Sequence, residues 1–379
     1  PHYFGTMATI HLPRGGGRKS KASLGSDRRV LLGVAVGTVL LYQVLTVQKT
    51  PEPGLVLPLG PSARQSDISK WFSSVAGNGF VDCDTVGDYV ESGQWVDPNK
   101  GHVYLRQVKT KPHFHVSVHN KEYDVVRWEH IFEKGDYYEH KVRKNFEYIL
   151  GETNAHWKSS IDHANTLPIV VDIGGNIGYF TLLSAAWKHA VVTFEINPTN
   201  VMRLCESVKF NREEMHVRIH RMGASNITGS TFEIEVQPNP GATGLEKGSK
   251  QAVSSNHVTT ERKFTITTIT LDDFATERKW FERDDLYISL LKLDTEGHEP
   301  QILQGAEKFF KHRLAKNLML EYRTKSRDAA TMLFDAGYVI VDDDANPHRI
   351  LSRKESEARV DSLAVKNHYT DLWFRRSDM

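Results

Sequence analysis

The stretch VVDIGGNIGYFT, from Val170 to Thr181, limits the possible folds of this chain more than any other segment. An apolar run ends in closely spaced glycines, and a helical pattern follows them. Glycines in such a strand–turn–helix unit allow a tight turn and let a ligand approach the backbone amides at the helix start. We therefore expect this turn to hold a cofactor through Asp172, Gly174, Gly175, Asn176, Gly178 and Tyr179.

Asn176 separates this turn from the dinucleotide fingerprint G-x-G-x-x-G. It stands where the second glycine would let a pyrophosphate approach the backbone, so NAD and FAD are disfavoured. Asp172 lies two residues before the first glycine. An acid there suits a ligand with an ammonium and a carboxylate group, such as the methionyl end of S-adenosylmethionine.

Strand and helix patterns alternate from residue 168 onward, which predicts an α/β fold with a mostly parallel sheet. The expected strands are 169–173, 191–195, 217–223, 231–236, 264–269, 288–293, 317–322, 339–342 and 371–374, and the expected helices are 179–187, 198–211, 272–281 and 300–310. Upstream, residues 126–150 have helical spacing, with a break at Gly135 and an end at Gly151. The polar segment 237–257 is either a lid or substrate loop or a simply disordered one.

Glu195 ends the second expected strand, 21 residues after Gly174. An acid at this place accepts hydrogen bonds from both ribose hydroxyls of a nucleotide-like cofactor. Asn197 follows it closely and joins the expected cofactor site. The simpler alternative is a solvated carboxylate at a strand end.

A second acidic group, Asp294 and Glu296, follows the strand expected at 288–293. Ligands bind outside the carboxyl ends of strands in open α/β sheets, so both acids should face the same crevice. A hydroxyl that accepts a methyl group must lose its proton, and we expect Asp294, Glu296 or His298 to take it. His298 has an alternative role as a helix-entry residue. Glu321 with Asp294 makes too few ligands to predict a metal.

Several motifs in the same order resemble the FkbM family of S-adenosylmethionine-dependent methyltransferases. They are DIGGNIGYFT at 172–181, TLDDF at 270–274, LKLDTEGHEP at 291–300 with Gly305-Ala306, TDLWF at 370–374 and Tyr138-Glu139, so the similarity covers roughly residues 127–376. The resemblance implies a class I methyltransferase fold, which is Rossmann-like with a mostly parallel seven-stranded sheet and helices on both faces. It also implies S-adenosylmethionine as cofactor and usually O-methylation, often of sugars or natural products.

Two positions depart from the family's commonest form. Gly175 replaces an alanine, which is harmless, whereas His298 replaces a small or acidic residue and leaves the acceptor chemistry open. The resemblance places the cofactor at the turn 172–178 and at Glu195, and the acceptor beside residues 294–298. An acceptor that is a small molecule or a glycan follows from the family's habits.

The N-terminal region predicts a membrane anchor. Basic residues dominate 1–29, and residues 30–47 are an uncharged run whose helix would measure roughly 27 Å, just enough to cross a bilayer. The basic flank predicts a cytosolic tail and a type II protein with its catalytic domain in the Golgi or endoplasmic reticulum lumen. A Pro-rich stem at 48–66, an accessory region at 67–126 and the methyltransferase domain at 127–379 follow. A cleaved signal peptide and a mitochondrial presequence are the alternatives.

Composition excludes several other classes. The 48 basic and 47 acidic residues nearly cancel, and no long basic face follows residue 30, so no nucleic-acid partner is expected. Cys83 and Cys205 are too few for a zinc ribbon. A bridge between them would need an oxidising lumen, and the helical pattern around Cys205 inside the core domain argues against one.

Two rival functions stay open. A type II glycosyltransferase would suit the anchor and stem, with Asp342-Asp343-Asp344 as its metal-binding Asp-x-Asp, although a polar turn after a strand explains these acids more simply. The other rival is an inactive chain that still binds the cofactor.

Overall fold

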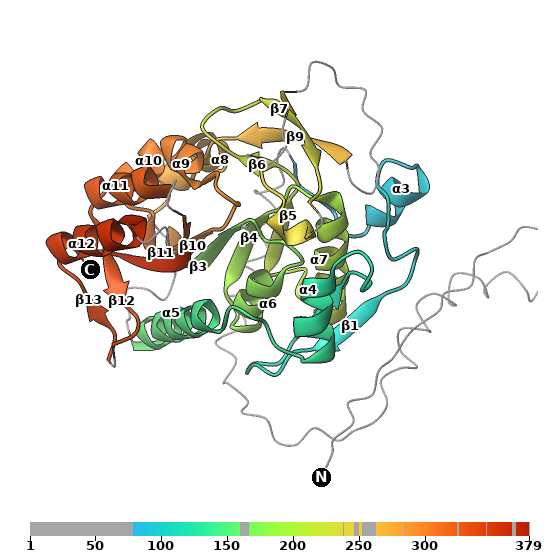
Figure 1. Cartoon of the computed structure of the whole chain (residues 1–379), viewed down its shortest axis with the longest axis horizontal. Helices are drawn as coiled ribbons and strands as arrows, with labels where there is room; N and C mark the ends of the chain where they lie inside the picture. Colours follow the sequence, from blue (N-terminus) through green and yellow to red (C-terminus); the bar gives the residue numbers. More distant parts are fainter. Residues whose placement is uncertain are drawn as a thin grey trace, which may run out of the picture. The chain divides into compact units, whose positions relative to one another are not determined.

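The large sheet of the molecule has eight strands in the order β13-β12-β14-β11-β10-β3-β4-β5 (Figure 1). The five strands from β11 to β5 run parallel, whereas β14 is antiparallel to both of its neighbours. The structure is a computed structural model, and it describes residues 79–159, 167–237, 239–245, 250–251, 263–284, 286–323, 326–345, 347–365 and 369–378. The order confirms the expected seven-stranded class I methyltransferase sheet, to which the two-residue β13 adds an edge.

The strands and helices have the following bounds. The strands of the large sheet are β3 (Leu167–Ile173), β4 (Ala190–Phe194), β5 (Val217–His220), β10 (Leu286–Leu293), β11 (Ala315–Tyr322), β12 (Tyr338–Asp342), β13 (Arg349–Ile350) and β14 (Thr370–Arg376). A second sheet of order β6-β9-β7-β8 contains β6 (Gly223–Ala224), β7 (Thr231–Glu235), β8 (Lys250–Gln251) and β9 (Lys263–Ile269), and β1 (Tyr104–Gln107) pairs with β2 (His115–Val118). The helices are α3 (Val86–Glu91), α4 (Val125–Arg127), α5 (His140–Ser159), α6 (Tyr179–Ala186), α7 (Pro198–Asn211), α8 (Leu271–Glu277), α9 (Glu299–Gln304), α10 (Glu307–Lys311), α11 (Arg327–Asp335) and α12 (Arg353–Val365), with shorter turns at η1 (Trp128–Glu133), η2 (Pro240–Ala242) and η3 (Trp280–Glu282).

Alternate residues of the central strands enter two separate cores, because successive side chains of a strand point to opposite faces of the sheet. Val171 and Leu291 belong to one core, together with α8 to α12. Val170 and Leu290 belong to the other, together with α5, α6 and α7. Figure 1 shows α5 and α6 on one side of the sheet and α8 to α11 on the other. Both faces are therefore covered, which explains the nearly continuous apolar runs of these strands.

Most expected elements are found, and the differences have local causes. The helix expected at 300–310 is broken into α9 and α10 at Gly305, where a Cβ atom would lie 2.2 Å from the carbonyl oxygen of Ser225. Gly151 does not end a helix, because α5 continues to Ser159 while Gly151 packs close to the ring of Trp187. The strand expected at 217–223 is divided, because the chain leaves the large sheet after β5 and enters the second sheet at β6.

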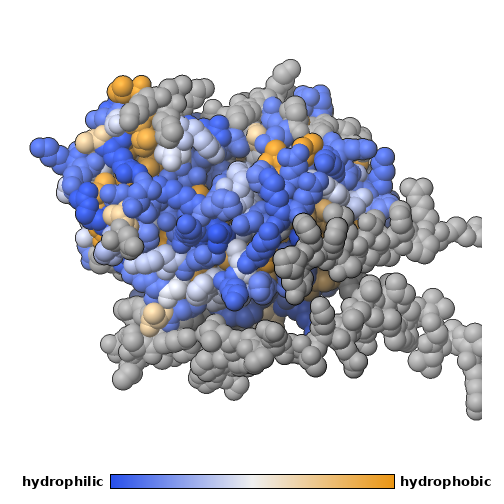
Figure 2. All heavy atoms as spheres, turned by 60° about the horizontal axis from the view of Figure 1, so that its bottom comes forward, coloured by the Kyte–Doolittle hydropathy of each residue, from blue (hydrophilic) through white to orange (hydrophobic). Residues whose placement is uncertain are grey.

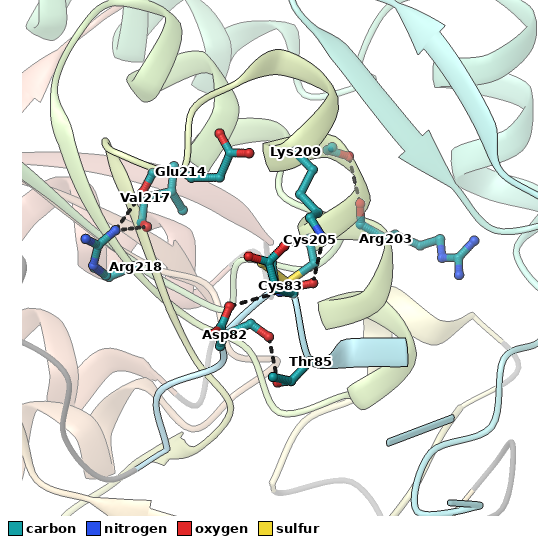
Figure 3. Close-up of a disulfide and its surroundings, with 11 residues drawn as sticks. Asp82, Cys83, Thr85, Arg203, Cys205, Lys209, Glu214, Val217 and Arg218 are labelled. Carbon is teal, nitrogen blue, oxygen red and sulfur yellow. Dashed lines mark hydrogen bonds and ion pairs between the residues drawn. A yellow bond between two sulfur atoms is a disulfide. The ribbon is translucent and has the colours of Figure 1, made fainter. Parts of the chain in front are cut away.

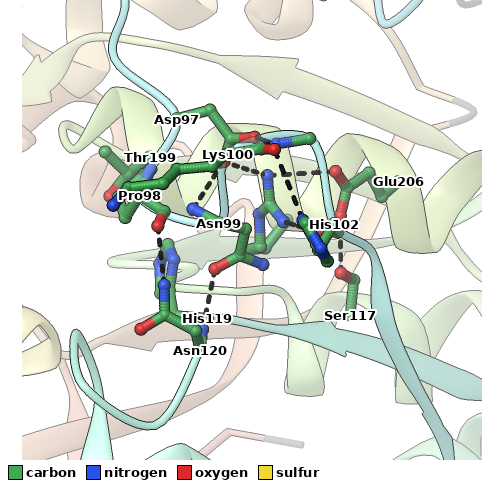
Figure 4. A network of polar contacts seen from close by, with 12 residues as sticks. Asp97, Pro98, Asn99, Lys100, His102, Ser117, His119, Asn120, Thr199 and Glu206 are labelled. Carbon is green, nitrogen blue, oxygen red and sulfur yellow. Dashed lines mark hydrogen bonds and ion pairs between the residues drawn. The ribbon is translucent and has the colours of Figure 1, made fainter. Parts of the chain in front are cut away.

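Residues 79–126 pack onto the outer side of α7 through a polar network (Figure 4). The buried guanidinium of Arg203 on α7 lies 2.9 Å from Asp97 and 3.0 Å from Glu206. Glu206 in turn accepts a hydrogen bond of 2.5 Å from Ser117 on β2. Buried charges are stable when they are paired and hydrogen-bonded in this way, so the network fixes the N-terminal segment in one register on α7.

A disulfide joins Cys83 to Cys205 on α7 (Figure 3). The expectation that these cysteines stay unpaired is therefore wrong. Helical spacing around Cys205 did place it on α7, but the segment before α3 folds back across that helix and brings Cys83 to a Cα–Cα distance of 5.2 Å. Lys209 supports the same contact, because its ammonium group donates to the carbonyl oxygen of Cys83.

The predicted anchor at 30–47 and stem at 48–66 lie outside the described residues. Within the described part of the chain, no helix is both long and apolar enough to span a bilayer. The face drawn in Figure 2 is mostly hydrophilic, with small hydrophobic patches that are separated from one another.

Candidate active site

A pocket lies beyond the carboxyl ends of β3, β4 and β10, between which the strand order reverses. β4 lies on one side of β3 and β10 on the other, so the loops that leave β3 and β10 diverge to opposite faces. Such a switch point is where open α/β sheets bind ligands. The pocket has a volume of about 700 Å³, including space open to solvent.

The glycines of the turn after β3 are required by close packing of the protein itself. A Cβ atom on Gly174 would lie 1.8 Å from the carbonyl oxygen of Asp294, and one on Gly178 would lie 2.1 Å from Leu204. Both residues also have positive φ angles, 83° and 92°. The turn is therefore pressed against β10 and α7, and Gly174 and Asn176 face the pocket while Gly175 and Gly178 lie behind it.

Asp172 and Tyr179 lie next to the turn but do not line the pocket. Asp172 is fully buried, accepts a hydrogen bond of 2.7 Å from Thr181 and lies 3.6 Å from the ammonium of Lys292. Tyr179 stacks on Tyr137 with ring centroids 4.4 Å apart. Both side chains therefore support the turn from inside the core.

Glu195 lines the pocket at the end of β4. Its carboxylate accepts bonds from the backbone amides of Asn176, at 2.7 Å, and Asn197, at 2.8 Å. Burial raises the pKa of Glu195, against these amide bonds, which lower it. Asn197 itself caps α7 by accepting from Thr199 and does not line the pocket. Glu195 thus links the glycine turn to the start of α7 with its carboxylate at the pocket wall.

The three expected catalytic residues, Asp294, Glu296 and His298, all line the same pocket. They lie on the turn between β10 and α9, in which Glu299 accepts bonds from the backbone amides of Thr295 and Gly297. Glu299, the first residue of α9, thus also shapes this turn.

Carboxylates gather at the end of the pocket opposite Glu195. Burial, followed by the nearby charge of Asp294, raises the pKa of both Glu139 and Glu321 to about 8 and that of Asp371 to about 7. Burial acts to lower the pKa of Lys292, but Asp294, 2.9 Å away, and other acids raise it well above its ordinary value. Like charges held close together resist ionising at the same time, so this end retains protons at neutral pH.

Sequence patterns did not identify every pocket residue. Arg127 and Tyr369 line the pocket, although neither stands in a recognisable motif. Part of the segment expected to be a lid or substrate loop also lines it, at Pro240, Gly241, Thr243, Gly244 and Leu245. A Cβ atom on Gly241 would collide with the guanidinium of Arg127. The spacing Gly-x-x-Gly in a polar loop was the available signal for this close approach.

Asp342, Asp343 and Asp344 form a group that could hold a cation among the described residues, but they lie outside the pocket. Lys141 lies 2.8 Å from Asp343 and 3.1 Å from Asp344, and Asn145 donates to Asp343. The acids occupy the end of β12 and the turn after it, as the simpler interpretation expects.

The strand order, the glycine turn after β3 and the acid after β4 define a methyltransferase fold of class I. Residues 172–340 match the family model described as the methyltransferase FkbM domain. Residues 172–340 are therefore similar to the FkbM methyltransferase domain, which agrees with the predicted family and its cofactor, S-adenosylmethionine.

No curated protein matches the chain. Similar solved structures include a SAM-dependent methyltransferase from Agrobacterium tumefaciens, with 10% identity over 72% of this chain and 69% of that one and a TM-score of 0.33. StiE O-MT residues 961–1257 share 9% identity over 75% and 90% of the two chains, with a TM-score of 0.31. An O-methyltransferase from Bacillus cereus in complex with SAH shares 10% identity over 66% and 96%, with a TM-score of 0.26. These scores are too low to support a conclusion about function.

Proposed function

We propose that this chain is an S-adenosylmethionine-dependent O-methyltransferase that acts on an uncharged hydroxyl of a glycan, a glycolipid or another small metabolite. One observation carries the proposal: a single pocket joins the glycine turn and Glu195 at one end to a group of protonatable carboxylates at the other. The first end suits a nucleoside cofactor, and the second suits a reaction that removes a proton.

The cofactor end has the groups that an adenosine moiety needs. Each carboxylate oxygen of Glu195 accepts one hydrogen bond from a backbone amide. A carboxylate can accept about four hydrogen bonds, so Glu195 can still accept hydrogen bonds from the ribose hydroxyls. Phe194, Ile196, Met222 and Leu245 supply apolar wall for the adenine ring. When bound, the cofactor supplies an electrophilic methyl group on a positively charged sulfonium, and the acidic wall of the pocket complements that charge.

The charge of the pocket limits the acceptor. Glu139, Glu195, Asp294, Glu296 and Glu321 all line it. A phosphate, sulfate or carboxylate on the acceptor would either meet the negative charges of these acids or prevent their ionisation, and desolvated like charges cost several kcal/mol. A neutral polyol avoids this cost and can donate hydrogen bonds to the acids.

Incubation with S-[methyl-³H]adenosylmethionine and fractionated membrane extract tests the proposal. We expect label in neutral glycan or glycolipid fractions and S-adenosylhomocysteine as the co-product. Label confined to anionic acceptors would contradict the charge argument. Cofactor binding without transfer to any fraction would favour the inactive cofactor-binding chain, and binding of a nucleotide sugar instead would favour a glycosyltransferase.

For location, we propose a type II membrane protein anchored by residues 30–47, with its catalytic domain in the secretory lumen. The Cys83–Cys205 disulfide supports this proposal, because such bonds persist in oxidising compartments. Asn226-Ile227-Thr228 supports it further as an exposed glycosylation sequon. Asn197-Pro198-Thr199 has the same spacing, but a proline in the middle position prevents glycosylation, so Asn197 serves as a negative control within the same chain.

Glycosidase treatment of the full chain from cells tests the location. We expect one mobility shift, absent in Asn226→Gln and retained in Asn197→Gln. Protease protection showing the catalytic domain in the cytosol would overturn the proposal, and import into mitochondria would favour the presequence alternative.

A further inference from the structure

Five acidic side chains line the pocket: Glu139, Glu195, Asp294, Glu296 and Glu321. They differ in whether their carboxylates already have hydrogen-bond or ion-pair partners within the protein. A general base must have a carboxylate oxygen that can reach the acceptor hydroxyl and can gain a proton at working pH. An acid held by a strong internal cation is a poor candidate, because protonation would break that ion pair.

Two of the five acids are held at the ends of β4 and β10. Glu195 accepts from the backbone amides of Asn176 and Asn197, so its oxygens organise the cofactor turn. Asp294 forms an ion pair of 2.9 Å with the buried ammonium of Lys292.

Two more are held by one arginine at the end of β11. Arg323 pairs with Glu296 and, at 2.9 Å, with Glu321. Glu321 also accepts a hydrogen bond of 2.7 Å from the hydroxyl of Tyr369. Both carboxylates therefore have a cationic partner that an acceptor hydroxyl would have to displace.

Glu139 differs from these four. It immediately precedes α5, is partly buried and has no ion pair with any cation among the described residues. The charges of Asp294 and Asp371 raise its pKa, and the charge of Lys292 and a hydrogen bond with Tyr138 lower it. It is thus a pocket carboxylate that an incoming hydroxyl can engage without first displacing an internal cation.

We propose that Glu139 is the general base that accepts the acceptor's proton during methyl transfer. The inference rests on the proposed function. In the step, an acceptor oxygen lone pair forms the new O–CH₃ bond, the electron pair of the breaking S–CH₃ bond goes to sulfur, and the hydroxyl proton goes to a carboxylate oxygen of Glu139. The products are the methyl ether, S-adenosylhomocysteine and a protonated Glu139. Asp294 and Glu296 then shape the pocket charge, and His298, which hydrogen-bonds Ser225 at 2.9 Å, positions the turn.

The pH dependence follows from the groups that face Glu139. They are Tyr137 and Tyr138 beside it, Arg127 on α4, Lys292 and Asp294 on β10, and Asp371 on β14. Burial and the two aspartates raise the pKa of Glu139 to about 8. A base must be ionised to act, so kcat/KM should rise as pH increases through about 8 and then level off.

Glu139→Gln tests the inference, with Glu122→Gln as the control because Glu122 is exposed and lies outside the pocket. We expect Glu139→Gln to lower kcat by about 10²- to 10⁴-fold, with S-adenosylmethionine affinity unchanged by calorimetry. Glu139→Asp should restore part of kcat, since it returns a carboxylate on a shorter side chain. The control should match the wild type in both measurements.

A second measurement does not depend on turnover. Difference infrared spectroscopy of wild type minus Glu139→Gln should show one carboxyl group that titrates near the kinetic pKa. A kcat of Glu139→Gln within about threefold of wild type, or a pH profile that the variant leaves unchanged, would overturn the assignment. If the wild type itself transfers no methyl group, the proposed function fails instead. If Glu139→Gln does not fold, a Glu139→Asp variant with wild-type kcat and pH profile would also overturn it.

Discussion

The two ends of the pocket are built in different ways. At the cofactor end, Gly174, Asn176 and Glu195 directly follow two adjacent strands. Backbone amides join them, because Gly174 donates to the carbonyl oxygen of Phe194 and Asn176 donates to the carboxylate of Glu195. At the acceptor end, Glu139, Glu321 and Tyr369 come from segments far apart in the chain and interact through side-chain charges and a tyrosine hydroxyl.

The two constructions differ in how they tolerate change. The closely packed backbone of the glycine turn leaves no room for a larger residue, because an added methyl group there collides with the protein itself. Side-chain charge is more adjustable, since a carboxylate can be exchanged for an amide of the same shape. We therefore expect the cofactor end to fail by losing binding and the acceptor end to fail by losing rate.

The largest effect is expected at Gly174. Gly174→Ala should abolish measurable S-adenosylmethionine binding and destabilise the fold by more than ~3 kcal/mol, because the new Cβ would lie 1.8 Å from the oxygen of Asp294. Gly297→Ala is the matched control, since Gly297 also has a positive φ, but a Cβ atom added there would meet nothing within 4 Å. It should cost only the ~1–2 kcal/mol of left-handed strain. Wild-type cofactor affinity in Gly174→Ala would contradict the expectation that the cofactor end fails by losing binding.

The next effect concerns the disulfide, which lies away from both ends of the pocket. Replacing Cys83 and Cys205 by Ser should lower the free energy of unfolding by about 2–4 kcal/mol, because the bridge closes a long loop in the unfolded chain. Cofactor affinity should not change. Urea unfolding and calorimetry, each with and without reductant, measure both quantities. A folded, reduced protein that no longer binds the cofactor would show that the cofactor end depends on residues 79–126.

The smallest effect is on stability at alkaline pH. The folded pKa of Glu139, about 8, exceeds the unfolded value of 4.5, so its contribution to stability is complete below pH 4.5 and is lost as pH rises through about 8. Above that pH the wild type buries a charge that Glu139→Gln does not. The melting temperature of Glu139→Gln should therefore rise relative to that of the wild type between pH 6 and pH 9. A constant difference across this range would argue against a raised pKa.

The cofactor end was largely predictable from sequence because its signals are local. The apolar run before Asp172, the glycines and the acid at Glu195 each follow from strand and turn chemistry. Their detailed roles were not predictable, since Asp172 and Tyr179 turn into the core. The acceptor end depends on which distant segments meet, and no local pattern encodes that. The pairing of Cys83 with Cys205 was missed for the same reason.

The central claim is that the Glu195 end of the pocket binds the cofactor and the Glu139 end serves the acceptor. Calorimetric titration of S-adenosylmethionine into wild type, Glu195→Ala and Glu139→Gln tests this claim most directly. We predict saturable binding to the wild type and at least ~100-fold weaker binding to Glu195→Ala, since two charge-assisted hydrogen bonds of about 1.5 kcal/mol or more each are lost. Glu139→Gln should bind like the wild type. Equal affinity in Glu195→Ala and wild type, or loss of binding in Glu139→Gln alone, would contradict this account.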